Sequence, residues 1–288
     1  MTSSFAQPLE IKHSAIDPIL LGVIRRIDES ARRCGTRYFL AGATAREIML
    51  RHVFGQAAGR RTFDVDFGIA VETWTEFESL KSALIAQANF IPHEKQKQRL
   101  FDAVNRVIVD LIPFGGIEHD GNIFWPPEED IIMRVTGFQD ALAGAVPVRL
   151  ASDLVVPVVS LPLLLVLKLF AWKDRKSEKR DAADIYTLLR QYGEAGNEDR
   201  LYGEHIGILE AQEFNLESAG AVLIAVDAKN LVSATTREQL NEILNSDDQM
   251  SELTDQMITT SSILDRSTGP QCELLIGKLR HGFFASEA

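Results

Sequence analysis

The sequence predicts an α+β fold in which strands and helices interleave early in the chain and helices dominate from about Leu161 onward. The stretch RTFDVDFGIAV (61–71) alternates apolar and polar side chains, which is typical of a strand with one buried face. The stretch NRVIVDLIPFGG (105–116) is rich in β-branched residues and indicates another strand. Between Asp17 and Cys34, apolar residues recur at helical spacing.

The elements before the first aspartate-bearing strand have clear start and stop signals. Asp17 can cap the first helix and Gly35 can end it. RYFLAG (37–42) indicates a short strand that runs into a glycine turn. The capping box Thr44-Ala-Arg-Glu47 then predicts a second helix, which stops at Gly55. The positive end of a helix that follows such a turn is suited to an anion such as phosphate.

Helices are also predicted before and after the strand at 105–116 in the sequence. The capping box Thr73-Trp-Thr-Glu76 begins one of them, with these side chains expected to face inward: Trp74, Phe77, Leu80, Leu84 and Ile85. Residues 161–193 indicate two helices or one interrupted helix. The composition changes near YGEAGNEDR (192–200), so we predict a catalytic domain with a helical extension at 1–195 and a helical C-terminal region at 196–288.

Composition and charge limit the kind of protein. The chain has 288 residues and a formal net charge of -11, which disfavours indiscriminate binding of nucleic acid through a global positive field. No secretory leader is apparent at the N-terminus, and the most apolar region, 154–170, is too interrupted to span a membrane. Cys34 and Cys272 are far apart and in no metal-binding spacing. We therefore expect a cytoplasmic protein.

Three aspartates on the two predicted strands are the strongest functional signal. Asp64 and Asp66 must project from one face of a strand, with α-carbons roughly 6.6 Å apart. At an effective dielectric of about 20, two charges at that spacing repel by roughly 2.5 kcal/mol, which calls for a cation. If the strands are neighbours, Asp110 joins this pair, and three carboxylates suit one or two divalent ions that support phosphoryl transfer. The alternative is that arginines such as Arg61 or Arg106 neutralise these acids.

These motifs together resemble the DNA polymerase β-like nucleotidyltransferase superfamily. The resemblance rests on Gly42-Ala43-Thr44, Thr62-x-Asp64-x-Asp66 and Asp110, covers about residues 36–191, and is greatest to the AbiEii-like branch of abortive-infection toxins. It implies a mixed sheet flanked by helices and transfer of a nucleoside monophosphate from an NTP to a hydroxyl. It also implies that the three aspartates bind Mg²⁺ or Mn²⁺, that Asp110 helps to activate the acceptor hydroxyl, and that Gly42 and Thr44 hold the triphosphate.

The turn departs from the superfamily pattern at Ala43. Members commonly have Gly-Ser or Gly-Gly there, and the serine hydroxyl touches phosphate. Ala43 has no hydroxyl, so only Thr44 or backbone N–H groups can serve. This departure keeps open a second interpretation from another functional class. In it, the chain is a catalytically silent module that senses a nucleotide such as ATP or binds a partner.

A basic segment follows at 168–180. Lys168 lies in an otherwise apolar helical turn, and a buried lysine needs an anion or a route to solvent. Related nucleotidyltransferases have a similar arrangement, matched here by Lys168, Arg175, Asp181 and Asp184, which implies contact of Lys168 and Arg175 with the nucleotide phosphates. The two aspartates either orient these cations or only form caps and ion pairs. Trp172 either stacks on a base or belongs to the core.

The predicted activity is Mg²⁺-dependent nucleotidyl transfer, and the sequence leaves the acceptor open. An RNA, especially a tRNA end, a small molecule and a protein hydroxyl all fit. The branch resemblance implies the toxin of a toxin–antitoxin pair and hence an antitoxin protein as partner.

Overall fold

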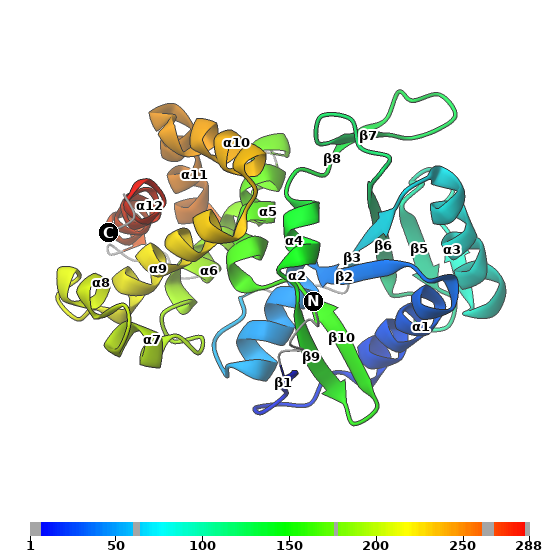
Figure 1. Ribbon diagram of the computed structural model, residues 1–288, viewed down its shortest axis with the longest axis horizontal. Coiled ribbons are helices and arrows are strands. Elements are labelled where there is room, and N and C mark those ends of the chain that lie inside the picture. Colours follow the sequence, from blue (N-terminus) through cyan, green and yellow to red (C-terminus); the bar gives the residue numbers. More distant parts are fainter. Residues whose placement is uncertain (1–6, 60–63, 176–177, 261–267, 286–288) are drawn as a thin grey trace, which may run out of the picture. The chain divides into compact units, whose positions relative to one another are not determined.

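The computed structural model describes residues 7–59, 64–175, 178–260 and 268–285 (Figure 1). Arg61 and Thr62, which the sequence analysis names, lie outside these ranges. The described residues form two compact units. The first lies within Met1–Val53 and Arg60–Ser160, and the second within Phe54–Gly59 and Leu161–Ala288.

The first unit is built on a mixed eight-stranded sheet in the order β1-β9-β10-β2-β3-β6-β5-β4 (Figure 1). In chain order the strands are β1 (Leu9–Glu10), β2 (Arg37–Ala41), β3 (Asp64–Val71), β4 (Phe90–Pro92), β5 (Arg99–Asp102), β6 (Ile108–Gly115), β9 (Val146–Ala151) and β10 (Leu154–Val158). The pairs β1–β9, β10–β2 and β3–β6 are parallel and the others are antiparallel. The predicted mixed sheet is confirmed.

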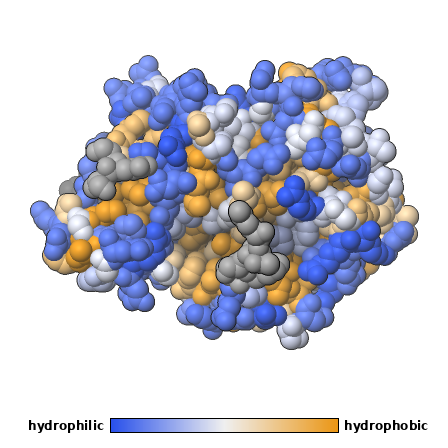
Figure 2. All heavy atoms as spheres, viewed as in Figure 1, coloured by the Kyte–Doolittle hydropathy of each residue, from blue (hydrophilic) through white to orange (hydrophobic). Residues whose placement is uncertain are grey.

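Helices of the first unit pack on this sheet through apolar faces. They are α1 (Pro18–Cys34), α2 (Gly42–Glu47), the π-helical continuation η1 (Ile48–Val53), α3 (Trp74–Gln87) and α4 (Phe138–Ala143). The predicted signals of α1 are confirmed: the Asp17 carboxylate accepts from the Ile19 N–H, and Gly35 adopts φ 68°. Val23, Ile24 and Ile27 are fully buried, whereas the opposite side of α1 forms a hydrophilic band (Figure 2).

The capping prediction for α3 is confirmed, because the Thr73 hydroxyl accepts from the Glu76 N–H. Phe77, Leu80 and Leu84 are fully buried, as predicted. The prediction that Ile85 faces inward is wrong, because this residue is 37% exposed. It follows Leu84 directly, and a helix turns by about 100° per residue, so Ile85 lies to one side of the face that Phe77, Leu80 and Leu84 bury.

A two-stranded arm leaves the main sheet (Figure 1). It consists of β7 (Asn122–Phe124) and β8 (Ile132–Arg134). Trp125, which follows β7 in the connection to β8, is buried and packs against Trp74 and Phe77 with ring centroids 5.1 and 5.5 Å away. The aromatic cluster therefore fixes the arm to α3.

The second unit is helical, which confirms the prediction for the chain after Leu161. Its helices are α5 (Leu161–Asp174), α6 (Arg180–Gln191), α7 (Glu198–Tyr202), α8 (Ile206–Ala211), α9 (Leu216–Leu231), α10 (Ala234–Asn245), α11 (Asp247–Thr260) and α12 (Thr268–Phe284). Helix α5 is apolar around most of its circumference and is buried among α6, α9 and α10. Within the described ranges, no helix combines the length and the apolar character needed to cross a membrane.

The compact units divide between residues 160 and 161. Helices α5 and α6 thus pack with the later helices, because their apolar surfaces face α9 and α11. The division predicted at residues 195 and 196 assigns these two helices to the catalytic domain as an extension. That functional assignment stays a prediction.

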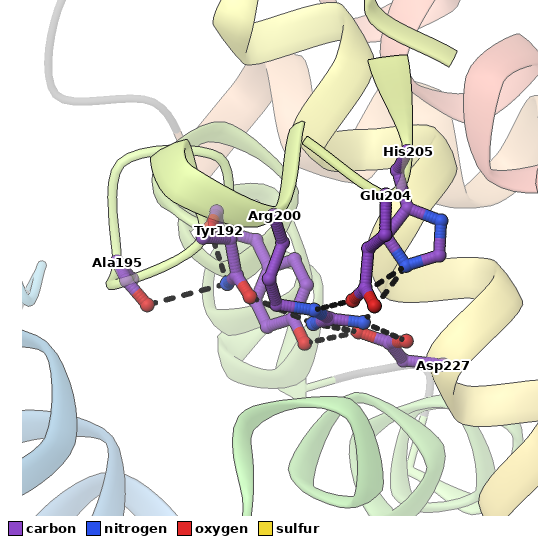
Figure 3. A network of polar contacts seen from close by, with 7 residues as sticks. Tyr192, Ala195, Arg200, Glu204, His205 and Asp227 are labelled. Carbon is purple, nitrogen blue, oxygen red and sulfur yellow. Dashed lines mark hydrogen bonds and ion pairs between the residues drawn. The ribbon is translucent and has the colours of Figure 1, made fainter. Parts of the chain in front are cut away.

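A polar network ties α6, α7 and α9 together (Figure 3). The Arg200 guanidinium donates to both carboxylate oxygens of Asp227 at 2.8 Å, and the Tyr192 hydroxyl donates to the same carboxylate at 2.5 Å. The Asn197 amide donates to the carbonyls of Tyr192 and Ala195. Burial, followed by the neighbouring Asp227 charge, raises the pKa of the Tyr192 phenol well above its usual range.

We expect Asp227→Asn to lower the free energy of unfolding by about 2 kcal/mol, because the Arg200 and Tyr192 donors lose a charged acceptor that is only 15% exposed. The matched control is Asp247→Asn, which breaks an ion pair between Arg280 and an aspartate that is 85% exposed. That change should alter stability by less than about 0.5 kcal/mol. Urea unfolding measures both, and equal effects would contradict the assigned role of the network.

Candidate active site

The three predicted aspartates lie on two neighbouring strands. β3 and β6 pair in parallel, and Asp66 is in register with Asp110. Residues in register on adjacent strands share a face, and Asp64 shares the face of Asp66 because it is two residues away. The alternate residues Val65 and Val109 are fully buried, whereas the aspartates are partly exposed. The three carboxylates therefore project from one side of the sheet.

The turn after β2 lies against one of these carboxylates. Ala41 pairs with Asp66 across β2 and β3, and Gly42 follows with φ 66°. A β-carbon added to Gly42 would lie 1.8 Å from the Asp66 Oδ2 atom. Glycine is needed here for two reasons: the backbone is left-handed, and the Asp66 carboxylate occupies the space of a side chain.

Thr44 has a different place from the one predicted. Helix α2 begins at Gly42, so Thr44 lies inside the helix and does not cap it; the predicted capping box at 44–47 is wrong. The reason is that the glycine turn itself starts the helix, two residues earlier. The Thr44 side chain is buried and its hydroxyl donates to the Asp64 carbonyl at 2.9 Å. Thr44 therefore anchors the start of β3, and its hydroxyl proton is not directed to a ligand.

The Asp110 carboxylate is held by an arginine that sequence reasoning missed. Arg99 donates from Nε to Oδ1 at 2.8 Å and from Nη2 to Oδ2 at 2.6 Å, which is a bidentate ion pair. The pair forms across the β5–β6 register, where Arg99 lies opposite Asp110. The hydrogen bond to Asp110 raises the pKa of Arg99, and the charges of Asp64 and Asp66 contribute in the same direction.

Of the two arginines considered from the sequence, Arg61 lies outside the described residues, and Arg106 does not occupy this position. Arg106 lies in the β5–β6 turn with φ 59°, and its guanidinium lies over the Phe101 ring, 5.4 Å from the centroid. Arg99 is part of the basic run 95–99, which at the sequence level looks like a solvated charge cluster. The residue types in RLFD (99–102) do not alternate and give no such signal; the structure buries Leu100 and Asp102, which leaves Arg99 on the other face.

Lys168 belongs to a separate ion-pair cluster within the second unit. Its Nζ atom is 2.9 Å from Asp181 Oδ1 and 2.6 Å from Asp184 Oδ2, and Arg175 donates to Asp181 at 3.0 Å. The Lys168 side chain is 13% exposed. Two carboxylates thus balance two cations, and the burial of Lys168 requires neither a ligand nor a route to solvent. The contact of Lys168 and Arg175 with phosphate stays a prediction.

Trp172 is a core residue of the same helix. Its side chain is buried, and its indole N–H donates to the Gln256 side chain at 3.1 Å. This contact joins α5 to α11. The ring has no face available for stacking on a base, so the core interpretation of Trp172 holds.

The comparison with protein families identifies the class. Residues 28–258 match the family described as "Nucleotidyl transferase AbiEii toxin, Type IV TA system". The match spans most of the chain and includes all three aspartates as well as Lys168 and Arg175. The chain belongs to this family and is a nucleotidyltransferase.

Solved structures similar to this chain have low sequence identity. One is the antibiotic-resistance factor ANT(2'')-Ia, at 11% identity and a TM-score of 0.38, covering 69% of this chain and 98% of that one. Another is an antigenic nucleotidyltransferase-like protein from Paracoccidioides brasiliensis, at 15% identity and a TM-score of 0.40, covering 72% and 95%. A third is the Thermotoga maritima CCA-adding enzyme, at 11% identity and a TM-score of 0.26, covering 94% and 82%. A search of curated proteins gives no match.

Gly42→Ala should lower stability and activity far more than the matched control Gly35→Ala. Both glycines have φ near 67°, but nothing lies within 4 Å of a β-carbon at Gly35, whereas one at Gly42 meets the Asp66 carboxylate. Gly35→Ala should lower the free energy of unfolding by about 1 kcal/mol through backbone strain alone. Gly42→Ala should cause the same backbone strain and should also push the Asp66 carboxylate out of its place. Chemical denaturation together with a nucleotidyl-transfer assay measures both effects, and similar losses in the two variants would refute the proposed close packing.

Proposed function

We propose that this protein transfers a nucleoside monophosphate from an NTP to a hydroxyl group with the help of Mg²⁺ or Mn²⁺. Asp64, Asp66 and Asp110 are the proposed metal-binding and catalytic residues. The observation that carries the proposal is the parallel, in-register pairing of Asp66 with Asp110. It gathers three oxygen donors on one face, and carboxylate oxygens are the protein ligands that Mg²⁺ prefers.

The donor set fits such an ion in its chemistry. Among the described residues, which include the three aspartates, no group of three or more Asp, Glu, His or Cys side chains is arranged to hold a metal ion, and the Asp110 carboxylate is engaged by Arg99. Two of the three donors lie on one strand and the third on its neighbour, and we propose that rotation of these side chains brings their oxygens together around the ion. A bound divalent ion supplies neutralisation of the phosphate charge.

The chain itself supplies positioning and proton transfer. Thr44 fixes the Asp64 backbone, and Gly42 allows the turn to approach Asp66. We assign to Asp110 acceptance of the proton from the attacking hydroxyl, in addition to metal binding.

We further propose that Gly42 and Thr44 contact the triphosphate through backbone N–H groups, because the Thr44 hydroxyl is engaged by Asp64. The first N–H groups of a helix have no acceptor within the helix. Lys168 and Arg175 are the proposed side-chain contacts to phosphate. Their partners Asp181 and Asp184 would orient them.

The acceptor in this proposal is a hydroxyl of an RNA, especially a tRNA end, of a small molecule or of a protein, and the net charge of -11 slightly favours a small or focused acceptor over long nucleic acid. The family description, which names a toxin of a type IV toxin–antitoxin system, supports a toxic activity and an antitoxin protein as partner. The two cysteines are free thiols, which suits action in a reducing cytoplasm.

A second candidate is a module that binds nucleotide without transferring it. The observation in its favour is the turn itself: Ala43 has no hydroxyl and the Thr44 hydroxyl is turned inward, so the turn offers phosphate no side-chain donor. Calorimetric binding of Mg-ATP without transfer would support this candidate.

Incorporation of each of the four radiolabelled NTPs into cellular RNA and protein extracts tests the proposal. Asp64→Asn, Asp66→Asn and Asp110→Asn should each reduce incorporation on the order of 100-fold or more, because each removes a charge needed for metal binding or proton transfer. Asp153→Asn is the matched control; this aspartate pairs with Arg25 on the surface and is 67% exposed. Full activity in any of the first three variants, with normal folding, would refute the assignment.

A further inference from the structure

We propose that Arg99 is a positioning residue that competes with the divalent cation for the Asp110 carboxylate, and so sets the cation concentration that the enzyme requires. The inference rests on the proposed function, because it takes Asp110 as a metal ligand. Beyond the three aspartates, Arg99 would determine how tightly the site binds the cation.

The competition follows from the geometry of the ion pair. Arg99 uses two donors on the two oxygens of Asp110, at 2.8 and 2.6 Å. A metal ion that binds Asp110 needs at least one of the same oxygens. Two cations at one carboxylate also repel each other, and Arg99 keeps its charge at every working pH. Binding of the metal at Asp110 therefore weakens or replaces the Arg99 contact.

Arg99 adds a positive charge to the face of the sheet that carries the three aspartates. The Arg99 side chain, which is 23% exposed, holds one of the three carboxylates on this face of the sheet. Arg99 reduces the repulsion among the aspartates, which stabilises the folded site. The same reduction makes the site less attractive to a second cation. One residue thus affects both the stability of the site and its affinity for metal.

The backbone around Arg99 is fixed, so exchange needs only a side-chain movement. The Arg99 carbonyl accepts from the His93 N–H, and the Arg99 N–H donates to the Gln96 carbonyl. The loop before it is held by the His93 ring, which accepts from the N–H groups of Lys95 and Gln96. A partly exposed guanidinium on a fixed backbone can rotate toward solvent or toward an anion such as a nucleotide phosphate. The strand pairing does not have to change.

Arg99→Met tests the proposal, because methionine keeps an unbranched, flexible side chain and removes the charge. Binding of Mn²⁺ alone, without nucleotide, is measured by the loss of the free-ion EPR signal. We expect Arg99→Met to bind Mn²⁺ about tenfold more tightly than the unmodified chain, because the change removes a positive charge beside the ion. Arg99→Lys, which keeps a charge but lacks the bidentate fork, should lie between the two.

Two controls make the result specific. Arg106 lies in the turn between β5 and β6, with its guanidinium over the Phe101 ring. Arg106→Met removes this charge and should leave Mn²⁺ affinity unchanged. In an Asp110→Asn background, Arg99→Met should no longer raise the affinity, since the carboxylate under competition is absent. Circular dichroism in EDTA checks folding, and Arg99→Lys keeps the test valid if the methionine variant does not fold.

The outcomes separate the two proposals. Equal or weaker Mn²⁺ binding by Arg99→Met and Arg99→Lys, with normal transfer by the unmodified chain, overturns the competition and leaves the proposed function standing. Tighter binding by Arg99→Met without any transfer by the unmodified chain supports the competition and overturns the proposed function. Absence of Mn²⁺ binding in every variant overturns both.

Discussion

The parallel pairing of β3 with β6 is the constraint on which the candidate site depends. It places Asp66 directly beside Asp110, and strand geometry then places Asp64 on the same face. A shift of this register by one residue would turn Asp110 into the core and bring Val109 or Leu111 to the surface. The fully buried side chains Val65 and Val109 oppose such a shift, because each would lose its apolar surroundings. The core thus specifies the site.

The carboxylates on one face of the sheet repel one another, and the surrounding residues reduce this repulsion or accommodate the carboxylates. Arg99 neutralises part of the charge through a bidentate pair with Asp110. Gly42 gives the Asp66 carboxylate room, and Thr44 holds the strand at the Asp64 carbonyl. In the second unit, Lys168 and Arg175 are balanced in a similar way by Asp181 and Asp184. In both clusters, ion pairs between opposite charges reduce the electrostatic cost of placing several charged side chains close together.

Local sequence signals predicted most of the elements, and they failed where two signals competed. Asp17 and Gly35 were sufficient to define α1, because capping needs only neighbouring backbone groups. Residues 44–47 also have the residue types of a capping box, yet α2 starts at Gly42, because the turn after β2 already begins the helix. The Thr44 hydroxyl then finds a partner 20 residues away, which no local pattern contains.

The sequence by itself determined the α+β class, the helical second part and the spacing that puts Asp64 and Asp66 on one face, because these follow from periods of side-chain direction within a single element. The tertiary structure decided that Asp110 joins them, that Arg99 and not Arg106 faces Asp110, and that Lys168 pairs with two aspartates. These contacts depend on strand order, register and helix packing. Such relations are set by the burial of many distant apolar side chains together, so no short stretch of sequence encodes them.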